Sequence, residues 1–311
     1  MNLSENVIKI LLGSISKSTK HHYCSSFNSF INFCEFNSFD PWNCNLSSIL
    51  EYLVSLFNAG LSYSSINTAR SSLSLFLGKI DNFAVGSHPM VVKLLRSMYR
   101  MNPPRPRYST MWKVDDLLNL FMNWPSNNVL ELKLLTFKLV GLLALTTGQR
   151  AQTLNAISID NIKFGDPVEI IITQTLKTSR AGFSQPCLVI PVYHNDKMCV
   201  VNCLKIYLQR TFVSRKHNNL FLSYVAPYKP VSNQSLSRWL CELLCFAGID
   251  TSYFKGHSFR HASTSKAANS GVPMDIVFRS AGWSERSRMF AKFYNVKTVE
   301  NSFLSSILSV S

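Results

Sequence analysis

Residues 130–150 read LELKLLTFKLVGLLALTTGQR, and this stretch decides how the second half of the chain folds. The part from 134 to 145 is strongly apolar, is interrupted by Lys138, and is too short to cross a bilayer. It therefore predicts a helix buried inside a protein core. A glycine break follows, and Arg150 comes just beyond it, where a rigid core element meets the surface.

The sequence on either side predicts a mainly helical chain with a small β-hairpin, which is an α+β fold. Apolar residues recur at spacings of three and four both before residue 100, where they predict a small bundle, and after residue 110. Two segments rich in β-branched and apolar residues, separated by a polar turn, predict the hairpin. The expected helices span 18–36, 46–59, 63–77, 89–99, 114–124, 130–146, 200–212, 232–247, 259–271 and 274–280, and the expected strands span 169–175 and 186–192.

Residues 101–110, which read MNPPRPRYST, mark the best domain boundary. Three prolines prevent a continuous helix, and Arg105 and Arg107 keep the segment solvated. The two arginines fit a path along a phosphate backbone and an ordinary Pro-rich loop about equally well. We therefore expect a helical domain at 1–100, a linker at 101–110, a second domain at 111–298 and a short amphipathic helix at 299–311.

The excess of positive charge favours a polyanionic partner. The 311 residues include 32 Lys and Arg against 17 Asp and Glu, which gives a formal net charge of +15. Residues 1–100 hold only 8 basic and 5 acidic side chains, so most of the excess lies in the rest of the chain. Nucleic acid is the first candidate partner for such a protein. A hydrophobic content of 46% excludes a disordered chain.

Eight cysteines are scattered along the chain. The first residues lack the charged-then-apolar order of a secretory signal, so we expect reduced thiols in an intracellular compartment, the nucleus if the organism is eukaryotic. Cys199 with Cys203, and Cys241 with Cys245, have helical i,i+4 spacing, but no second pair or His lies at zinc-site spacing. An interpretation as core residues is better, and neither a metal site nor a membrane attachment is expected.

Besides the Arg150 segment, two segments of the second half carry residue types suited to phosphate chemistry. Residues 256–262, GHSFRHA, place His257 and Arg260 three apart at a predicted helix N-terminus, where free N–H groups favour anions. Residues 281–283, AGW, supply an indole N–H donor shortly before Tyr294, which lies among aromatic residues. Each of these residues alone has a plainer interpretation as a surface charge, a helix cap or a core aromatic.

The order of these residues resembles the signature of the tyrosine recombinase (phage integrase) family. Residues that only fill a core would not be expected to follow this order along the chain. The helical bundle, with YSSINTARSSL at residues 63–73, is similar to the core-binding domain of the family. The family runs Arg, a Lys in a β-hairpin, His-x-x-Arg, His or Trp, and Tyr, and this chain has Arg150, Lys177, His257, Arg260, Trp283 and Tyr294.

Two details resemble the DIRS-like or Crypton-type recombinases of eukaryotic mobile elements most closely. Thr153 stands three residues after Arg150, where many bacterial and phage members have an acidic residue that orients the arginine. Trp283 stands where many members have His, and Cre recombinase also has Trp there.

The resemblance implies a site-specific recombinase that cleaves and rejoins double-stranded DNA without a metal or ATP. It also implies a homotetramer on two DNA duplexes, linked by the tail at 299–311 packing in trans. The expected roles are Tyr294 as the nucleophile that forms a 3′-phosphotyrosyl link, Arg150 and Arg260 as phosphate clamps, His257 as base, Lys177 as acid and Trp283 as an indole donor.

Some alternatives stay open at this point. Lys163 and Arg180 compete with Lys177 because hairpin registers are hard to predict. A type IB topoisomerase would share the chemistry, and a recombinase-derived DNA-binding protein without catalysis is a third alternative. The expected DNA contacts are Lys20, Asn67, Arg70, Arg105, Arg107 and Arg238.

Overall fold

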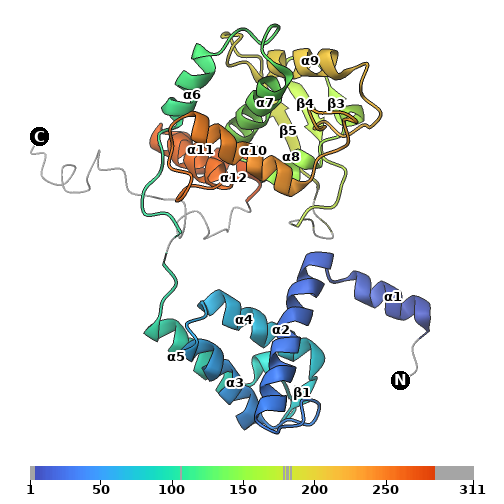
Figure 1. Ribbon diagram of the computed structural model, residues 1–311, viewed down its shortest axis with the longest axis vertical. Coiled ribbons are helices and arrows are strands. Elements are labelled where there is room, and N and C mark those ends of the chain that lie inside the picture. The colour runs from blue at the N-terminus through green and yellow to red at the C-terminus, as the bar shows by residue number, and fades with distance from the viewer. Residues whose placement is uncertain (1–3, 106, 178, 180–181, 183, 284–311) are drawn as a thin grey trace, which may run out of the picture. The chain divides into compact units, whose positions relative to one another are not determined.

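The computed structural model describes residues 4–105, 107–177, 179, 182 and 184–283. The chain divides into two compact units, Met1–Arg105 and Pro106–Ser311, each with its own hydrophobic core (Figure 1). The division falls inside the proline-rich segment at 101–110. None of the helices in the described part of the chain has both the length and the apolar run that a bilayer span requires.

Unit 1 is a helical bundle in which the predicted apolar faces form the core. Ser16, Asn45 and Ser62 cap three of its helices, because each side-chain oxygen accepts a hydrogen bond from the backbone N–H three residues further on. Phe30 and Leu53 are completely buried in the core. The elements are α1 (Glu5–Gly13), α2 (Lys17–Phe36), α3 (Leu46–Asn58), α4 (Tyr63–Phe76), β1 (Lys79–Ile80), β2 (Phe83–Ala84), the 3₁₀ turn η1 (Val85–Ser87) and α5 (Pro89–Met101).

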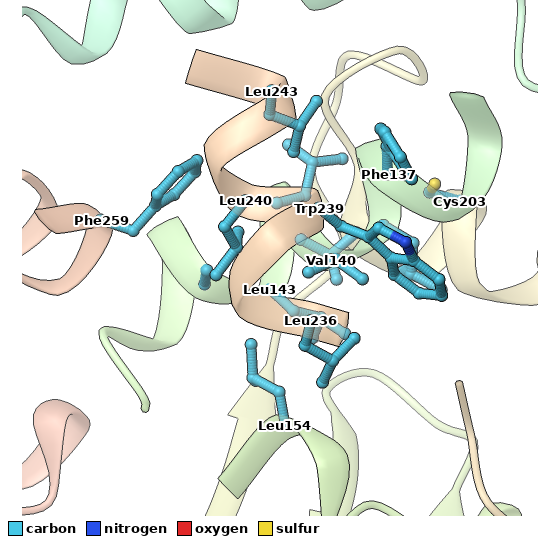
Figure 2. Packing of buried hydrophobic residues seen from close by; sticks show 14 of the residues in the cluster. Phe137, Val140, Leu143, Leu154, Cys203, Leu236, Trp239, Leu240, Leu243 and Phe259 are labelled. Carbon is cyan, nitrogen blue, oxygen red and sulfur yellow. The ribbon is translucent and has the colours of Figure 1, made fainter. Parts of the chain in front are cut away.

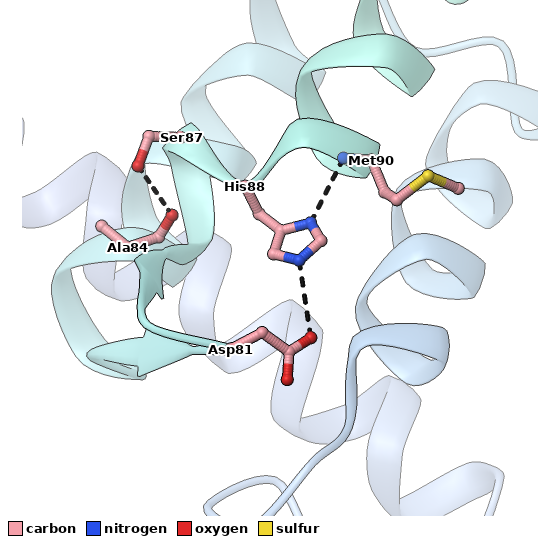
Figure 3. Close-up of polar contacts among 5 residues, drawn as sticks. All are labelled: Asp81, Ala84, Ser87, His88 and Met90. Carbon is pink, nitrogen blue, oxygen red and sulfur yellow. Dashed lines mark hydrogen bonds and ion pairs between the residues drawn. The ribbon is translucent and has the colours of Figure 1, made fainter.

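A polar cluster ties the β1–β2 hairpin to the start of α5 (Figure 3). Nδ1 of the buried His88 accepts a hydrogen bond from the Met90 N–H at 3.2 Å, and its Nε2 lies 3.5 Å from the carboxylate of Asp81. Ser87 Oγ donates to the Ala84 carbonyl at 3.0 Å. Since His88 is the N-cap of α5, these bonds fix the direction in which the helix leaves the hairpin. The sequence had predicted only the helix.

Unit 2 is built around α7 (Leu132–Thr147), the buried helix predicted from the opening stretch. Every residue from Leu135 to Ala144 is buried, and α9, α10 and α11 pack against the helix. Figure 2 shows Phe137, Val140 and Leu143 of α7 beside the apolar side chains of α10. The other helices are α6 (Val114–Asn123), α8 (Ala151–Asn155), the 3₁₀ turn η2 (Ile159–Asn161), α9 (Val200–Thr211), α10 (Asn233–Phe246), α11 (Ser258–Asn269) and α12 (Met274–Ala281).

The predicted hairpin is present and belongs to a three-stranded antiparallel sheet in the order β3 (Ile162–Lys163), β4 (Val168–Ile171), β5 (Cys187–Ile190). Glu169 pairs with Val189, so the strands meet as expected, although they are shorter than predicted. The α+β class is confirmed. The short elements α1, β1, β2, α8 and β3 and the two 3₁₀ turns were not predicted, because two to nine residues give too little periodicity.

Lys138 is the one charged residue in the apolar run at 134–145 of α7, and its side chain is completely buried. No described atom accepts a hydrogen bond from its Nζ, which lies 6.0 Å from the centroid of the Phe121 ring. Burial disfavours the ammonium form and lowers the pKa of Lys138. The side chain therefore opposes the stability of the core around it.

We expect Lys138→Met to raise the free energy of unfolding by about 1–3 kcal/mol at pH 7, because it removes an unsatisfied buried polar group. The pKa of Lys138 is lower in the folded than in the unfolded chain, so wild type gains stability as pH rises from the folded value toward about 10.4. The advantage of the variant should shrink over that window.

Urea unfolding of both proteins between pH 7 and pH 10 measures the effect. Lys205→Met, at an exposed position of α9, is the control and should change stability by less than about 0.5 kcal/mol. A Lys138→Met protein that is less stable than wild type at pH 7 would contradict the interpretation.

Candidate active site

The guanidinium of Arg260 joins three segments of unit 2. Arg260 lies in the first turn of α11 and is only 4% exposed. Its Nη1 donates hydrogen bonds to the carbonyl oxygens of Gly148, at 2.7 Å, and of Ala281. Its Cζ lies 4.1 Å from the centroid of the Trp283 ring, in a cation–π contact. The end of α7, the start of α11 and the end of α12 therefore meet at one side chain.

The turn after α7 needs the glycine at position 148. Gly148 has φ 59°, in the left-handed region, and ends the helix with its carbonyl directed at Arg260. The next residue, Gln149, is buried and donates from Nε2 to the Ser280 carbonyl at 2.7 Å. These bonds on both sides fix the backbone from which Arg150 projects.

Arg150 itself is exposed, and no described side chain bonds to its guanidinium. It precedes the short helix α8, and its carbonyl accepts the Thr153 N–H at 2.9 Å. Thr153, which stands where an acidic residue could orient the arginine, is only 5% exposed. A threonine offers Arg150 no carboxylate. The backbone, and not a side-chain partner among the described residues, positions this arginine.

Lys177 lies in the connection between β4 and β5, close in space to the Arg150 segment. Its backbone N–H donates to Oε1 of Gln152 at 3.3 Å, and its side chain is exposed. The connection is also held by Ser179, whose Oγ accepts the Leu176 N–H and donates to Oε1 of Gln185, both at 2.8 Å. This places Lys177 beside α8, although no described bond joins its ammonium to Arg260.

His257 stands at the N-cap of α11, three residues before Arg260, and bonds to a residue that the sequence did not single out. Its Nε2 lies 2.8 Å from the hydroxyl of Tyr108. Although part of the side chain is exposed, burial of the imidazole lowers the pKa of His257 to about 4, and the positive charge of Arg107 adds to the effect. His257 is therefore neutral at pH 7.

The sequence did not indicate Tyr108 as a site residue, because it lies in the segment interpreted as a solvated linker. It is in fact 2% exposed and packs against aromatic rings from the segment before α11. A tyrosine that follows a Pro-Arg run is the only signal that sequence offered. Tyr294 and the tail at 299–311 lie outside the described residues, as does Arg180.

These features agree with the comparison with protein families. The model of the phage integrase family matches residues 116–300, which is more than half of the chain and includes every expected catalytic position. The chain belongs to the phage integrase family. As a member it is a site-specific DNA recombinase of the tyrosine type. The DIRS-like or Crypton-type assignment stays a prediction.

The fold is similar to that of several solved recombinases. A lambda integrase(75–356) dimer bound to a COC′ core site superposes with a TM-score of 0.60 at 16% identity over 96% of both chains. XerH site-specific recombinase bound to difH gives 0.57 at 13% identity over 86% of this chain and 71% of that one. The Tn1549 transposon integrase (82–397) with circular intermediate DNA gives 0.52 at 16% over 85% and 84%. No curated protein matches the chain.

The residues expected to contact DNA differ in their surroundings. Within unit 1, Lys20 is exposed on α2, whereas Asn67 and Arg70 on α4 are half-buried, and Arg70 donates to the Gly86 carbonyl at 3.2 Å. Arg105 is exposed in the linker. A further row of exposed cations on α5, with no acidic residue in that helix, was not singled out from the sequence: Lys93, Arg96 and Arg100.

Within unit 2 of the recombinase, Arg107 is exposed beside His257, and Arg238 is exposed on α10, 3.8 Å from Glu242. An exposed pair of this kind contributes little to stability, so Arg238 can exchange it for a phosphate at small cost. Among the described residues, no group of three or more His, Cys, Asp or Glu side chains is arranged to hold a metal ion.

Gly256 is a second residue of the site that the sequence had not assigned a role. A Cβ at this position would lie 2.6 Å from the backbone oxygen of Ser237 and 3.2 Å from its Cα. Its N–H also lies 3.1 Å from Sγ of Cys241. The chain before His257 therefore runs directly against the backbone of α10, and only glycine fits.

We expect Gly256→Ala to destabilise the recombinase by about 1–3 kcal/mol, because the methyl group meets backbone that cannot move aside. Thermal unfolding measures the change. Gly271→Ala tests a glycine with open space around its Cβ but a φ of +80°, which separates backbone strain from close contact. A Gly256→Ala protein as stable as wild type would show that α10 and the His257 segment can separate.

Proposed function

We propose that this recombinase cleaves DNA by attack of the Tyr294 hydroxyl oxygen on a scissile phosphate. The Tyr294 hydroxyl proton passes to water as the oxygen forms a 3′-phosphotyrosyl link. The bond from phosphorus to the 5′ oxygen breaks with a proton from Lys177, and the reverse step rejoins DNA without a metal or ATP. One observation carries the proposal: the Nη1 bonds of Arg260 fix the segments of Arg150 and Trp283 to the helix that begins after His257. Tyr294 follows Trp283 closely in the chain.

The charge of the transition state explains the two arginines. A phosphodiester gains negative charge as it becomes five-coordinate, and a guanidinium can contact two oxygens at once without losing its proton. Arg150 is exposed and available for such a contact, whereas Arg260 already holds carbonyl oxygens through Nη1. We therefore assign Arg150 to phosphate binding, and Arg260 both to phosphate binding and to holding the site together.

Lys177 is the proposed acid for the 5′ oxygen. The bond from its backbone to Gln152 supports this choice, since it brings the lysine beside the helix that follows Arg150. Lys163, one of the two alternatives from the sequence, lies in β3 opposite Glu169, and no described bond links it to that helix. His257 and Trp283 complete the set as groups that hydrogen-bond to the phosphate.

The two arginines should respond differently to substitution. Arg150→Ala should slow cleavage by a factor of about 10²–10³ and leave the melting temperature unchanged, because the side chain is exposed. Arg260→Ala should slow cleavage and also cost more than about 2 kcal/mol of stability, because two charge-assisted hydrogen bonds are lost. Equal effects of both variants on the melting temperature would contradict these roles.

A nicked suicide substrate tests the proposed function directly. After cleavage beside the nick a short fragment diffuses away, so the covalent protein–DNA complex should accumulate with wild type and be absent with Tyr294→Phe. Chelators and the omission of ATP should not change its yield. A complex that survives in Tyr294→Phe would show that another residue is the nucleophile, and no complex with wild type would favour the DNA-binding alternative.

An assay for recombination between two DNA sites distinguishes a recombinase from a type IB topoisomerase, the remaining alternative, because a topoisomerase relaxes supercoils without a partner duplex. We propose that the protein acts as a homotetramer on two duplexes and that the amphipathic tail at 299–311 packs in trans. The similar solved structures include a lambda integrase tetramer bound to a Holliday junction, which is consistent with this arrangement.

Deleting residues 299–311 should weaken synapsis of two DNA duplexes while single-site cleavage continues. Gel-filtration or mobility-shift assays with one and two sites measure this difference. Unchanged assembly and recombination by the truncated protein would rule out the proposed role of the tail.

A further inference from the structure

The last residues of the segment 101–110, and Trp112 after it, are bound closely to the segment that opens α11. Tyr108 packs edge-on against Tyr253 and His261, with ring centroids 5.5 and 5.2 Å away, and against Phe254 and His257 at 5.5 and 5.4 Å. The indole nitrogen of Trp112 donates to Oγ of Ser258 at 2.9 Å, and the backbone N–H of Ser109 donates to the Tyr253 hydroxyl at 2.9 Å. His257 is thus held from a part of the chain 149 residues away.

The direction of the bond between Tyr108 and His257 follows from what surrounds it. Burial raises the pKa of Tyr108, so the phenol keeps its proton, and the Lys255 backbone hydrogen-bonds to the same hydroxyl oxygen. The hydroxyl proton then has one acceptor among the described residues, Nε2 of His257, at 2.8 Å. A neutral imidazole offers a lone pair on one nitrogen and an N–H on the other.

We propose that Tyr108 is a positioning residue that donates its hydroxyl proton to Nε2 of His257 and so fixes the neutral tautomer with the proton on Nδ1. The structural contact stands by itself, whereas its consequence for catalysis rests on the proposed function. With Nε2 occupied, Nδ1 is the ring nitrogen of His257 that is left to contact DNA, and it carries the proton. It is then a donor to a phosphate oxygen and not the base expected from the sequence.

The electrostatics around the pair agree with this assignment. A base whose pKa is about 4 is poorly matched to a phenol with a pKa near 10, whereas a neutral N–H donor needs no titration. No described carboxylate offsets the causes that lower the pKa of His257. The titratable groups that surround the pair are Arg107, Cys241, Tyr253, Lys255 and His261.

Histidine-selective ¹⁵N NMR of the full chain without DNA tests the tautomer, with the His257 signal identified by its loss in His257→Gln. In wild type we expect the proton on Nδ1, a hydrogen-bonded Nε2, and a neutral ring at pH 6. Tyr108→Phe should shift the population toward the Nε2–H form and raise the pKa of His257. A wild-type ring with its proton on Nε2, or a Tyr108→Phe ring identical to wild type, would overturn the proposal.

Tyr253→Phe is the matched control, because it removes a hydroxyl from the same aromatic cluster that bonds Ser109 and not His257. It should leave the His257 signals unchanged. Melting temperatures of both variants show whether the cluster still packs. Since these measurements need no substrate, they decide the tautomer even if no covalent DNA complex is ever observed.

Cleavage of the suicide substrate adds a test that a merely structural role would not pass. Tyr108→Phe should slow cleavage about three- to tenfold at pH 8, the range expected when one hydrogen bond is lost. The deficit should shrink as pH falls through the raised pKa, because the imidazolium carries a proton on both nitrogens. A deficit that grows as pH falls would identify His257 as a base and contradict the proposal.

Discussion

The active site depends on one buried guanidinium and the two helix ends that it holds. Helices α7 and α12 both end in a left-handed glycine, and the carbonyl oxygens exposed there need donors. Nη1 of Arg260 supplies them at Gly148 and Ala281, and the positive charge suits the negative ends of the two helices. The candidate site is therefore assembled from helix termini, where backbone groups lie beside the side chains that we propose to bind phosphate.

The hydrophobic core explains why this arrangement is rigid. Helix α7 is buried from Leu135 to Ala144, so the turn that carries Arg150 starts from an element that cannot shift without disturbing α9, α10 and α11. Gly256 brings the chain before His257 onto the backbone of α10, and Gln149 ties the Arg150 turn to α12. The exposed side chain of Arg150 is available for the proposed phosphate contact, because its backbone, and not its side chain, is held.

Much of this could be predicted from the sequence. The longer helices of both units and the hairpin of unit 2 followed from apolar spacing, and an ordered set of residues indicated the family: Arg150, Lys177, His257, Arg260, Trp283 and Tyr294. Residue order carries this information because the chemistry fixes which groups must be present, and chain connectivity fixes where they occur.

The contacts that tune the site could not be predicted, because they join distant parts of the chain. Tyr108 and His257 are 149 residues apart, and a tyrosine in a Pro-Arg segment carries no local sign of its partner. The close approach of Gly256 to Ser237 depends on how α10 packs, and the burial of Lys138 contradicts the usual exposure of lysine. Local sequence patterns indicate helices and strands, whereas these contacts arise from tertiary packing.

The claim that Arg260 holds the site together is tested most directly by amide hydrogen exchange of Arg260→Met against wild type. Exchange should become faster both at residues 146–154 and at residues 278–283, while the β4–β5 pairing and the helices of unit 1 keep their protection. If both segments exchange at wild-type rates in the variant, other contacts hold the helix ends together and this account of the site is wrong.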